Sequence, residues 1–501
     1  MISDQSDLRN VFPGLSAEEF RRLGHQAVDV AAEYLATIGE GPVYKQMKPE
    51  ERSLLMDQPL PDQGTSPDDI LLFLKRSIMA HPMGNGHPRF FGWVNSPPAV
   101  LPIITDLLAA SMNPSCAGGD HAAIYLERCA VRWIMELVGY PTEGSMGLLV
   151  SGASMASLTA LAAARHWAAQ RDGWNVRKHG LQGQRPAFVL YVSQECHSCV
   201  RKAAELLGLG EGSVRTISVD AEFRMNLPVL QSAIAKDRTA GLRPFCVVAS
   251  AGTVSTGAID PLDIVAKLCS SEELWLHIDG AYGAIGILDE EKRRNYRGLE
   301  RADSLALDPH KWLSVPVECG CVLVRDEALL RDAFSLVPPY IRTEPGKGIG
   351  GLPWYSEYGF QQTRGFRALK LWTALMHAGR SGLRNLIARH NQLASHLASL
   401  IEAAPDLELC APVTLSIVCF RYVPATGQWN EEQLATLNKQ IMETVQSSGE
   451  SFITNAVLRG RFVLRACILN YLTEEVDLMA LIDTVRRTGA GTSEAMHRQT
   501  A

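Results

Sequence analysis

The sequence lacks several patterns that would fix its class at once. No uninterrupted apolar run approaches the roughly 20 residues that cross a bilayer, so we expect no membrane association. No run is rich in Lys and Arg, and a net charge of −6 over 501 residues gives no electrostatic reason to expect nucleic acid as a partner. The first residues also lack the basic and then apolar pattern of a signal peptide, which favours a cytoplasmic protein.

The eleven cysteines lack the spacing of a metal site. Cys196 and Cys199 form one C-x-x-C pair. Structural zinc would need a second pair of similar spacing, and Cys319 and Cys321 match it poorly. We therefore expect reduced thiols and no metal.

The chain divides into three parts by its patterns. Residues 1–89 predict an N-terminal helical segment, in which Ser16 is an N-cap and Glu19 stands at the capping-box position. We expect this segment to pack on a partner subunit, although its pattern is equally compatible with packing on its own chain. Residues 90–365 predict a large α/β domain, and residues 366–501 predict a small α+β domain.

Short apolar runs alternate with helical stretches through the central part of the chain. Continuous apolar strands between helices indicate a sheet buried on both faces, and hence a largely parallel α/β core. Ligands bind beyond the carboxyl ends of the strands in such sheets, so residues that carry chemistry should follow these runs. The runs span residues 188–192, 245–249, 274–278, 304–307 and 321–324.

Three features at the ends of apolar runs together meet the requirements of pyridoxal phosphate. Lys311 lies between an imidazole and an indole after one run, where partial desolvation would leave an amine able to form a Schiff base. Asp279 ends another and could keep a pyridine nitrogen protonated, although alone it could equally be a helix N-cap or a structural ion-pair partner. Ala153 and Ser154 lead into a helical run from Met155 to Gln170, and free N–H groups at its start would receive a phosphate.

These residues stand in runs that resemble the group II pyridoxal-phosphate decarboxylases, especially the aromatic-L-amino-acid decarboxylase branch. Pro-His-Lys-Trp at 309–312 together with His-Ile-Asp at 277–279 is highly specific, and the resemblance extends from 19–24 through 87–92 to 462–465. It implies the fold type I transferase fold, with a mostly parallel seven-stranded sheet flanked by helices and a small α+β C-terminal domain. It also implies a homodimer with active sites at the interface.

The resemblance further implies a role for each cofactor-binding residue. Lys311 matches the Schiff-base lysine, Asp279 the partner of the pyridine nitrogen, and His197 the histidine that stacks on the cofactor ring. Asp308 departs from the Asn often found two residues before the family's histidine, and we assign it no role. The remaining cofactor contacts implied are Ala153, Ser154, Thr253, Ala281 and His310.

The reaction type rests, within this resemblance, on Tyr340. It stands in a Val-Pro-Pro-Tyr run before glycines 346–351, which suit a flexible lid, and the family's tyrosine at this place donates a proton to Cα. Relatives with Phe there resemble oxidative aldehyde synthases. The alternatives are therefore an aldehyde synthase, a glutamate or aspartate decarboxylase, and an inactive regulatory homologue.

The predicted substrate is an aromatic L-amino acid such as DOPA, tryptophan, tyrosine or phenylalanine. Trp93 offers an aromatic wall in the segment that lines the family's substrate pocket, and Ser96 could hydrogen-bond the substrate carboxylate. Thr363 stands where the aromatic branch often has Gly and would reshape the pocket. Val94 and Asn95 also depart from the branch's usual residues in this segment.

Overall fold

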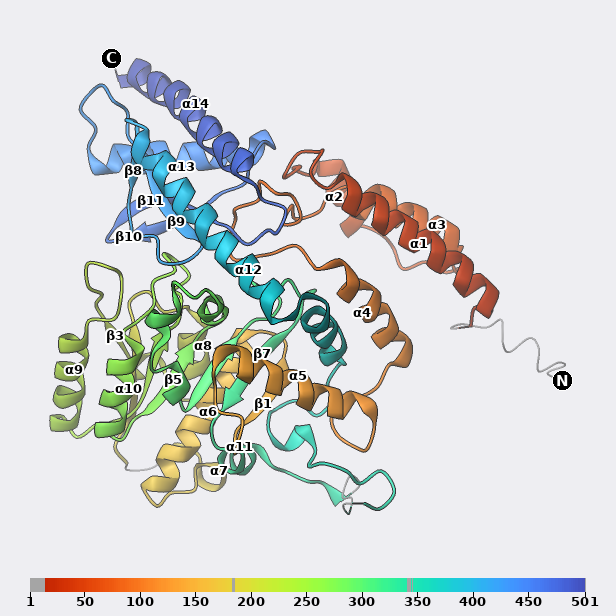
Figure 1. Ribbon diagram of the computed structural model, residues 1–501, viewed down its shortest axis with the longest axis vertical. Helices are drawn as coiled ribbons and strands as arrows, with labels where there is room; N and C mark the ends of the chain where they lie inside the picture. The colour runs from red at the N-terminus through yellow and green to blue at the C-terminus, as the bar shows by residue number, and fades with distance from the viewer. Residues whose placement is uncertain (1–13, 183–184, 340–343, 345, 501) are drawn as a thin grey trace.

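Three groups of elements make up the molecule. A central α/β body carries a smaller C-terminal group at one end, and the N-terminal helices extend away to one side (Figure 1). The computed structural model describes residues 14–182, 185–339, 344 and 346–500.

Seven strands form the sheet of the central body, in the order β1-β7-β6-β5-β4-β2-β3. Only β7 runs antiparallel to the other strands of this sheet, since it pairs antiparallel with both β1 and β6. Every residue of β2, β5, β6 and β7 is buried, as their apolar runs predicted for a sheet covered on both faces, and β1, which no such run predicted, is buried as well. The strands are β1 Met146–Val150, β2 Phe188–Ser193, β3 Val214–Ile217, β4 Arg243–Ser250, β5 Trp275–Asp279, β6 Ser304–Leu307 and β7 Gly320–Val324.

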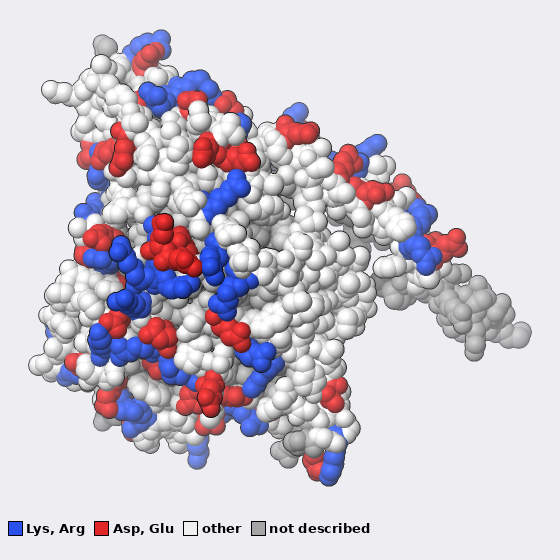
Figure 2. All heavy atoms as spheres, viewed as in Figure 1, with Lys and Arg blue, Asp and Glu red and all other residues white. Residues whose placement is uncertain are grey.

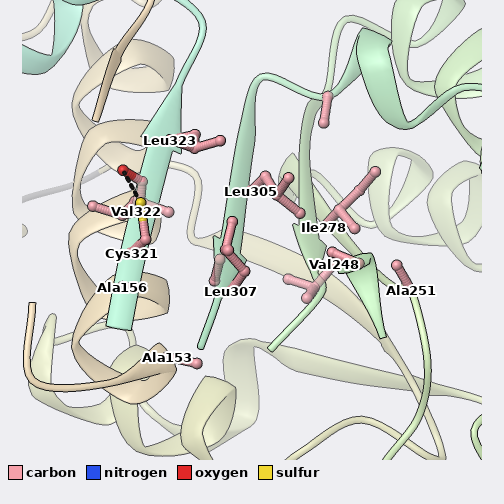
Figure 3. Close-up of a cluster of buried hydrophobic side chains, with 14 of the residues drawn as sticks. Ala153, Ala156, Val248, Ala251, Ile278, Leu305, Leu307, Cys321, Val322 and Leu323 are labelled. Carbon is pink, nitrogen blue, oxygen red and sulfur yellow. Dashed lines mark hydrogen bonds between the residues drawn. The ribbon is translucent and has the colours of Figure 1, made fainter. Parts of the chain in front are cut away.

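Helices flank this sheet and complete its core. The alanine-rich α6 packs against β4, β5, β6 and β7, and its small side chains allow close approach to the strands. Figure 3 shows Ala153 and Ala156 of this helix beside apolar side chains such as Leu307 and Cys321. The helices are α4 Val100–Met112, α5 Ala122–Val138, α6 Ala153–Arg171, α7 Val176–His179, α8 Cys199–Leu206, α9 Leu227–Thr239, α10 Leu262–Ser271 and α11 Glu327–Phe334.

A second, antiparallel sheet forms the C-terminal group, in the order β10-β11-β9-β8. The long helix α12 connects it to the central body, because Leu371 and Leu375 pack in the large core whereas Leu397 and Ile401 pack in the small one. The elements are α12 Arg367–Ala403, β8 Leu407–Leu409, β9 Ile417–Tyr422, α13 Glu431–Ser448, β10 Thr454–Leu458, β11 Arg461–Cys467 and α14 Glu475–Thr500.

The N-terminal helices α1 Ala17–Thr37, α2 Pro49–Met56 and α3 Pro67–Phe73 contain no buried residue. The predicted capping box of α1 is confirmed: Ser16 Oγ accepts from Glu19 N at 3.2 Å, and Ser16 N donates to Glu19 Oε2 at 3.3 Å. Among the residues described, no helix combines the length and the hydropathy needed to span a membrane.

Candidate active site

A cavity of about 560 Å³ opens at the carboxyl edge of the large sheet. Its walls come from the segments that follow β1, β2, β4, β5 and β6, because the carboxyl ends of these strands meet at one edge. The structure therefore brings together most of the predicted site residues, which come from distant parts of the sequence. Those that line the cavity are Trp93, Ala153, Ser154, His197, Thr253, Asp279, Ala281, His310 and Lys311.

Lys311 follows β6 and is held there by a buried carboxylate. Its Nζ lies 3.0 Å from Oδ2 of Asp308, whose side chain is almost fully buried. The other carboxylate oxygen, Oδ1, accepts a hydrogen bond from the backbone N–H of Ala153 at 2.7 Å. Asp308 thus connects Lys311 to the first residue of α6 and is a part of the site, although the sequence comparison led us to assign it no role.

The first turn of α6 lines the cavity at Ala153, Ser154 and Met155, and the first turn of any helix carries free backbone N–H groups. Such groups lack partners within their own helix, and together with the helix dipole they favour an anion. Close packing around this turn depends on Gly320 at the start of β7, where a Cβ atom would lie only 2.4–2.7 Å from backbone atoms of Gly152. The turn therefore fits a phosphate group whose oxygens accept from backbone N–H.

Asp279 and His197 supply the remaining polar groups that an aromatic cofactor needs. Asp279 is the last residue of β5, and its Oδ1 accepts from Ala281 N at 3.1 Å. His197 follows β2, and its Nδ1 accepts from Cys199 N at 3.2 Å, which fixes the ring at the cavity wall. A buried carboxylate suits a pyridinium nitrogen, and an imidazole suits the face of a ring. The donor set therefore fits pyridoxal phosphate.

Thr253 and His310 line the cavity but are also bound to their own loops. Thr253 Oγ1 lies 3.0 Å from Thr256 Oγ1 and accepts from Ala258 N at 3.1 Å. His310 Nδ1 lies 2.8 Å from the carbonyl oxygen of Cys319, and burial lowers the pKa of this imidazole. These contacts hold the two loops that follow β4 and β6 in fixed positions.

Three predicted residues are not placed in the cavity wall. Ser96 is buried behind it, where its hydroxyl donates to the backbone carbonyl of Lys311 at 2.5 Å and is not turned toward a substrate. Thr363 is exposed, since its neighbour Arg364 takes the inward position, and it is not among the described residues that line the cavity. Tyr340 lies outside the described residues.

A further carboxylate of the cavity, Glu195, was not singled out from the sequence. It is buried and lines the cavity beside the loop that carries His197. Burial raises the pKa of its carboxyl group, and a hydrogen bond with Ser255 lowers this pKa by a smaller amount. Its place two residues before His197, just past an apolar strand, was the only available signal.

Two buried histidines support the strand ends around the cavity. His277 lies two residues before Asp279, and its ring nitrogens lie 2.9 Å from Ser304 Oγ and 3.3 Å from Ser157 Oγ. His390 Nδ1 accepts from the indole of Trp312 at 2.9 Å. Burial lowers the pKa of each imidazole to about 4.

Because the pKa of His277 and His390 is lowered, we expect the free energy of unfolding to fall as the pH drops from 6.5 to about 4. Their folded-state pKa lies below the ordinary value of 6.5, so in this interval the unfolded chain binds protons that the folded chain does not. Each buried neutral imidazole contributes up to about 3 kcal/mol to the free energy of unfolding. This contribution is fully present above pH 6.5 and is lost below about pH 4. Urea unfolding at pH 7.5 and pH 5 measures it. His390→Gln should reduce the pH dependence and the exposed His377→Gln should not; equal pH dependence in both variants would contradict the prediction.

Comparisons with known proteins identify the family of this chain. Residues 49–423 match the family described as the pyridoxal-dependent decarboxylase conserved domain. An aromatic-L-amino-acid decarboxylase of Bacillus atrophaeus is 33% identical, over 94% of this chain and 96% of the relative. A phenylacetaldehyde synthase of Arabidopsis thaliana is 30% identical, over 93% and 94%.

A solved structure extends the likeness to three dimensions. The crystal structure of Oryza sativa TDC with PLP and tryptamine superimposes with a TM-score of 0.89 at 27% identity, covering 96% of this chain and 99% of that one. The fold type I architecture implied by the sequence is confirmed. This chain belongs to the pyridoxal-dependent decarboxylase family, and its cofactor is pyridoxal phosphate.

Proposed function

We propose that this chain converts an aromatic L-amino acid to the corresponding amine and carbon dioxide. The observation that carries the proposal is the meeting of Lys311, Asp279 and His197 with the first turn of α6 in one cavity. The named activities of the relatives, among them an aromatic-L-amino-acid decarboxylase, support the same reaction.

Three polar groups of the cofactor are assigned to residues that line this cavity. We assign Lys311 to the aldehyde, Asp279 to the pyridine nitrogen, and the turn of Ala153 and Ser154 to the phosphate, with the N–H of Ser154 as a donor because that of Ala153 already binds Asp308. The two ring faces are assigned to His197 and to Ala281, and Thr253 and His310 complete the surroundings. When bound, the cofactor accepts the electron pair that a breaking Cα bond releases.

The cavity wall favours an aromatic side chain over an acidic one. Lys311 is the only Lys or Arg among the described residues that line the cavity, and it is already assigned to the cofactor. An acidic side chain would therefore lack a cationic partner, which a buried carboxylate needs. Trp93, Val254 and Val317 instead offer exposed apolar surface, which suits an aromatic ring.

A panel of L-amino acids tests this proposal directly. Carbon dioxide, amine and hydrogen peroxide are quantified for aromatic, acidic and aliphatic substrates with the purified holoenzyme. We expect amine and carbon dioxide in equal amounts from aromatic substrates and little peroxide. Faster decarboxylation of glutamate or aspartate would replace the proposal with the acidic alternative, and no turnover of any amino acid would favour the regulatory homologue.

We propose Tyr340 as the proton donor to Cα after carbon dioxide leaves, so Tyr340→Phe should change the product. Loss of a positioned general acid is expected to lower amine formation about 10²-fold or more. Aldehyde, ammonia and hydrogen peroxide should rise together, since dioxygen then oxidises the substrate carbon. Amine, aldehyde and peroxide are measured in one reaction. Unchanged amine production would remove Tyr340 from the mechanism.

We also propose a homodimer, in which the segment 1–89 packs on the partner subunit. Apolar side chains of α4 stand exposed, among them Ile104 and Leu108, and Figure 2 shows few charged side chains over this helix. A contiguous exposed apolar surface of this kind is typical of an interface.

The eleven cysteines are all free thiols, which supports a reducing compartment such as the cytoplasm.

Charges placed on this surface should separate the subunits. Ile104→Glu combined with Leu108→Glu is expected to convert a dimer to a monomer, because carboxylates would be buried without partners. Sedimentation velocity measures the change. Leu206→Glu, at the exposed end of α8, serves as the control and should remain dimeric. A wild-type protein that sediments as a monomer would contradict the proposal.

A further inference from the structure

One guanidinium group of the small sheet reaches two separate walls of the cavity. Arg465 lies in β11 and is 3% exposed. Its Nε donates to the carbonyl oxygens of Val254 at 2.9 Å and Ser255 at 3.2 Å, and its Nη1 donates to the carbonyl oxygen of Trp93 at 2.8 Å. Because Trp93 and Val254 both line the cavity, this side chain fixes the distance between the segments that carry them.

The backbone at Trp93 needs such support. Its φ of +46° lies in the left-handed region, a strained conformation for a residue with a side chain that persists only where the surroundings hold it. The N–H of Trp93 makes a long contact of 3.4 Å with Thr454 Oγ1, so the bond from Arg465 to its carbonyl is the stronger restraint.

This backbone conformation presents the indole to the cavity. Trp93 is 49% exposed, and its ring packs against Phe90 and Phe452, with centroid distances of 6.1 and 5.4 Å. Val254, held by the other end of the same guanidinium, is also partly exposed at 39%. The two apolar walls are therefore positioned by one charged side chain that is itself buried.

We propose that Arg465 is a positioning residue that sets selectivity for aromatic substrate side chains by holding Trp93 and Val254. The inference rests on the proposed function of the cavity. It adds Arg465, a residue of the small sheet, to the residues that determine substrate selectivity. A guanidinium is suited to this task because its rigid fork donates in two directions at once, which a lysine ammonium on a flexible stem does not reproduce.

The measured quantity is the ratio of kcat/KM for L-tryptophan to kcat/KM for L-methionine. In Arg465→Met we expect this ratio to fall about tenfold, since a displaced wall removes contacts that only the larger side chain makes. Arg465→Lys should show a smaller fall, because it retains the charge and one of the donor directions. The matched control is Arg461→Met on the same strand. The Arg461 side chain does not line the cavity and forms an ion pair with Glu408 at 2.6 Å, so the ratio of this variant should equal that of the wild type.

A double-mutant cycle tests whether Arg465 acts through Trp93. In a Trp93→Ala background, Arg465→Met should change the ratio much less than it does in the wild type, because the wall that it positions is already absent. An equal loss of kcat/KM for both substrates would overturn the proposal, since a direct bond to the carboxylate or a general structural loss affects all amino acids alike. A full effect in the Trp93→Ala background would also overturn it.

A crystal structure of the Arg465→Met holoenzyme gives a readout that is independent of turnover. We expect Trp93 to leave the left-handed region and its indole to move; an unchanged backbone and indole would refute the positioning role. A wild-type enzyme that fails to decarboxylate aromatic amino acids would refute the proposed function instead, and the crystallographic comparison would still decide whether Arg465 positions Trp93.

Discussion

Lys311→Ala is expected to lower kcat/KM by at least about 10³-fold, which corresponds to about 4 kcal/mol of lost transition-state stabilisation. Alanine supplies no amine for the cofactor aldehyde, so the variant should also lose the yellow colour of a lysine-linked cofactor. It leaves Asp308 without the ammonium that now lies 3.0 Å from its carboxylate, which adds a cost in stability. Turnover, visible absorbance and unfolding are measured on the same preparation.

Two comparisons make the Lys311 result specific. Lys202→Ala removes an exposed lysine of α8 and should retain both colour and turnover. Lys311→Arg keeps a positive charge beside Asp308 but cannot form a Schiff base, so it should recover stability without recovering turnover. A Lys311→Ala variant that retains a tenth of the wild-type kcat/KM would exclude covalent cofactor attachment at this residue.

Arg364→Met is expected to destabilise the protein by about 3–5 kcal/mol, because it leaves the carboxylate of Glu127 buried without its cation. Both side chains are almost completely buried, and they bond the strand that leads to the α6 turn: Leu149 N donates to Glu127 at 3.0 Å, and Arg364 Nη2 donates to Leu149 O at 2.6 Å. Arg364 Nη1 also donates to Cys116 O at 2.9 Å. Urea unfolding measures the loss, and cofactor retention should fall with it.

The pair can be tested against a matched exposed pair. Arg171→Met breaks an ion pair with Glu273 in which both side chains are largely exposed, and it should cost no more than about 1 kcal/mol. Replacing Glu127 and Arg364 together with methionine should cost less than Arg364→Met alone, since no unpaired charge remains. Equal losses of unfolding free energy in Arg364→Met and Arg171→Met would show that burial of the Arg364–Glu127 pair adds nothing to the cost of breaking it.

Five strands of the large sheet were predictable from the sequence, whereas its buried strand β1 and its edge strand β3 were not. The five apolar runs correspond to β2, β4, β5, β6 and β7, because burial on both faces favours apolar or small residues at successive positions. The edge strand β3 is only partly buried, and β10 alternates buried and exposed residues, so neither forms a continuous apolar run. Such strands are recognised only from their neighbours in the sheet.

Asp308 shows where local resemblance was a poor guide. A departure from the usual residue was interpreted as the loss of a role, but the structure places the carboxylate between Lys311 and Ala153. The partner N–H belongs to a turn that follows a different strand, and strand order is not written in the spacing of residues along the chain. The contact therefore became visible only once β1 and β6 were placed on either side of β7.

The sequence by itself determined the cofactor, the family, the buried strands and the lysine at the end of β6, because these follow from short motifs and from patterns of apolar residues. Only the tertiary structure decided which side chains share the cavity, and it placed Ser96 and Thr363 outside its wall. The bonds from Arg465 to Trp93 and from Arg364 to Glu127 join residues hundreds of positions apart. Contacts of this kind depend on how separate elements pack, and packing is a property of the whole fold.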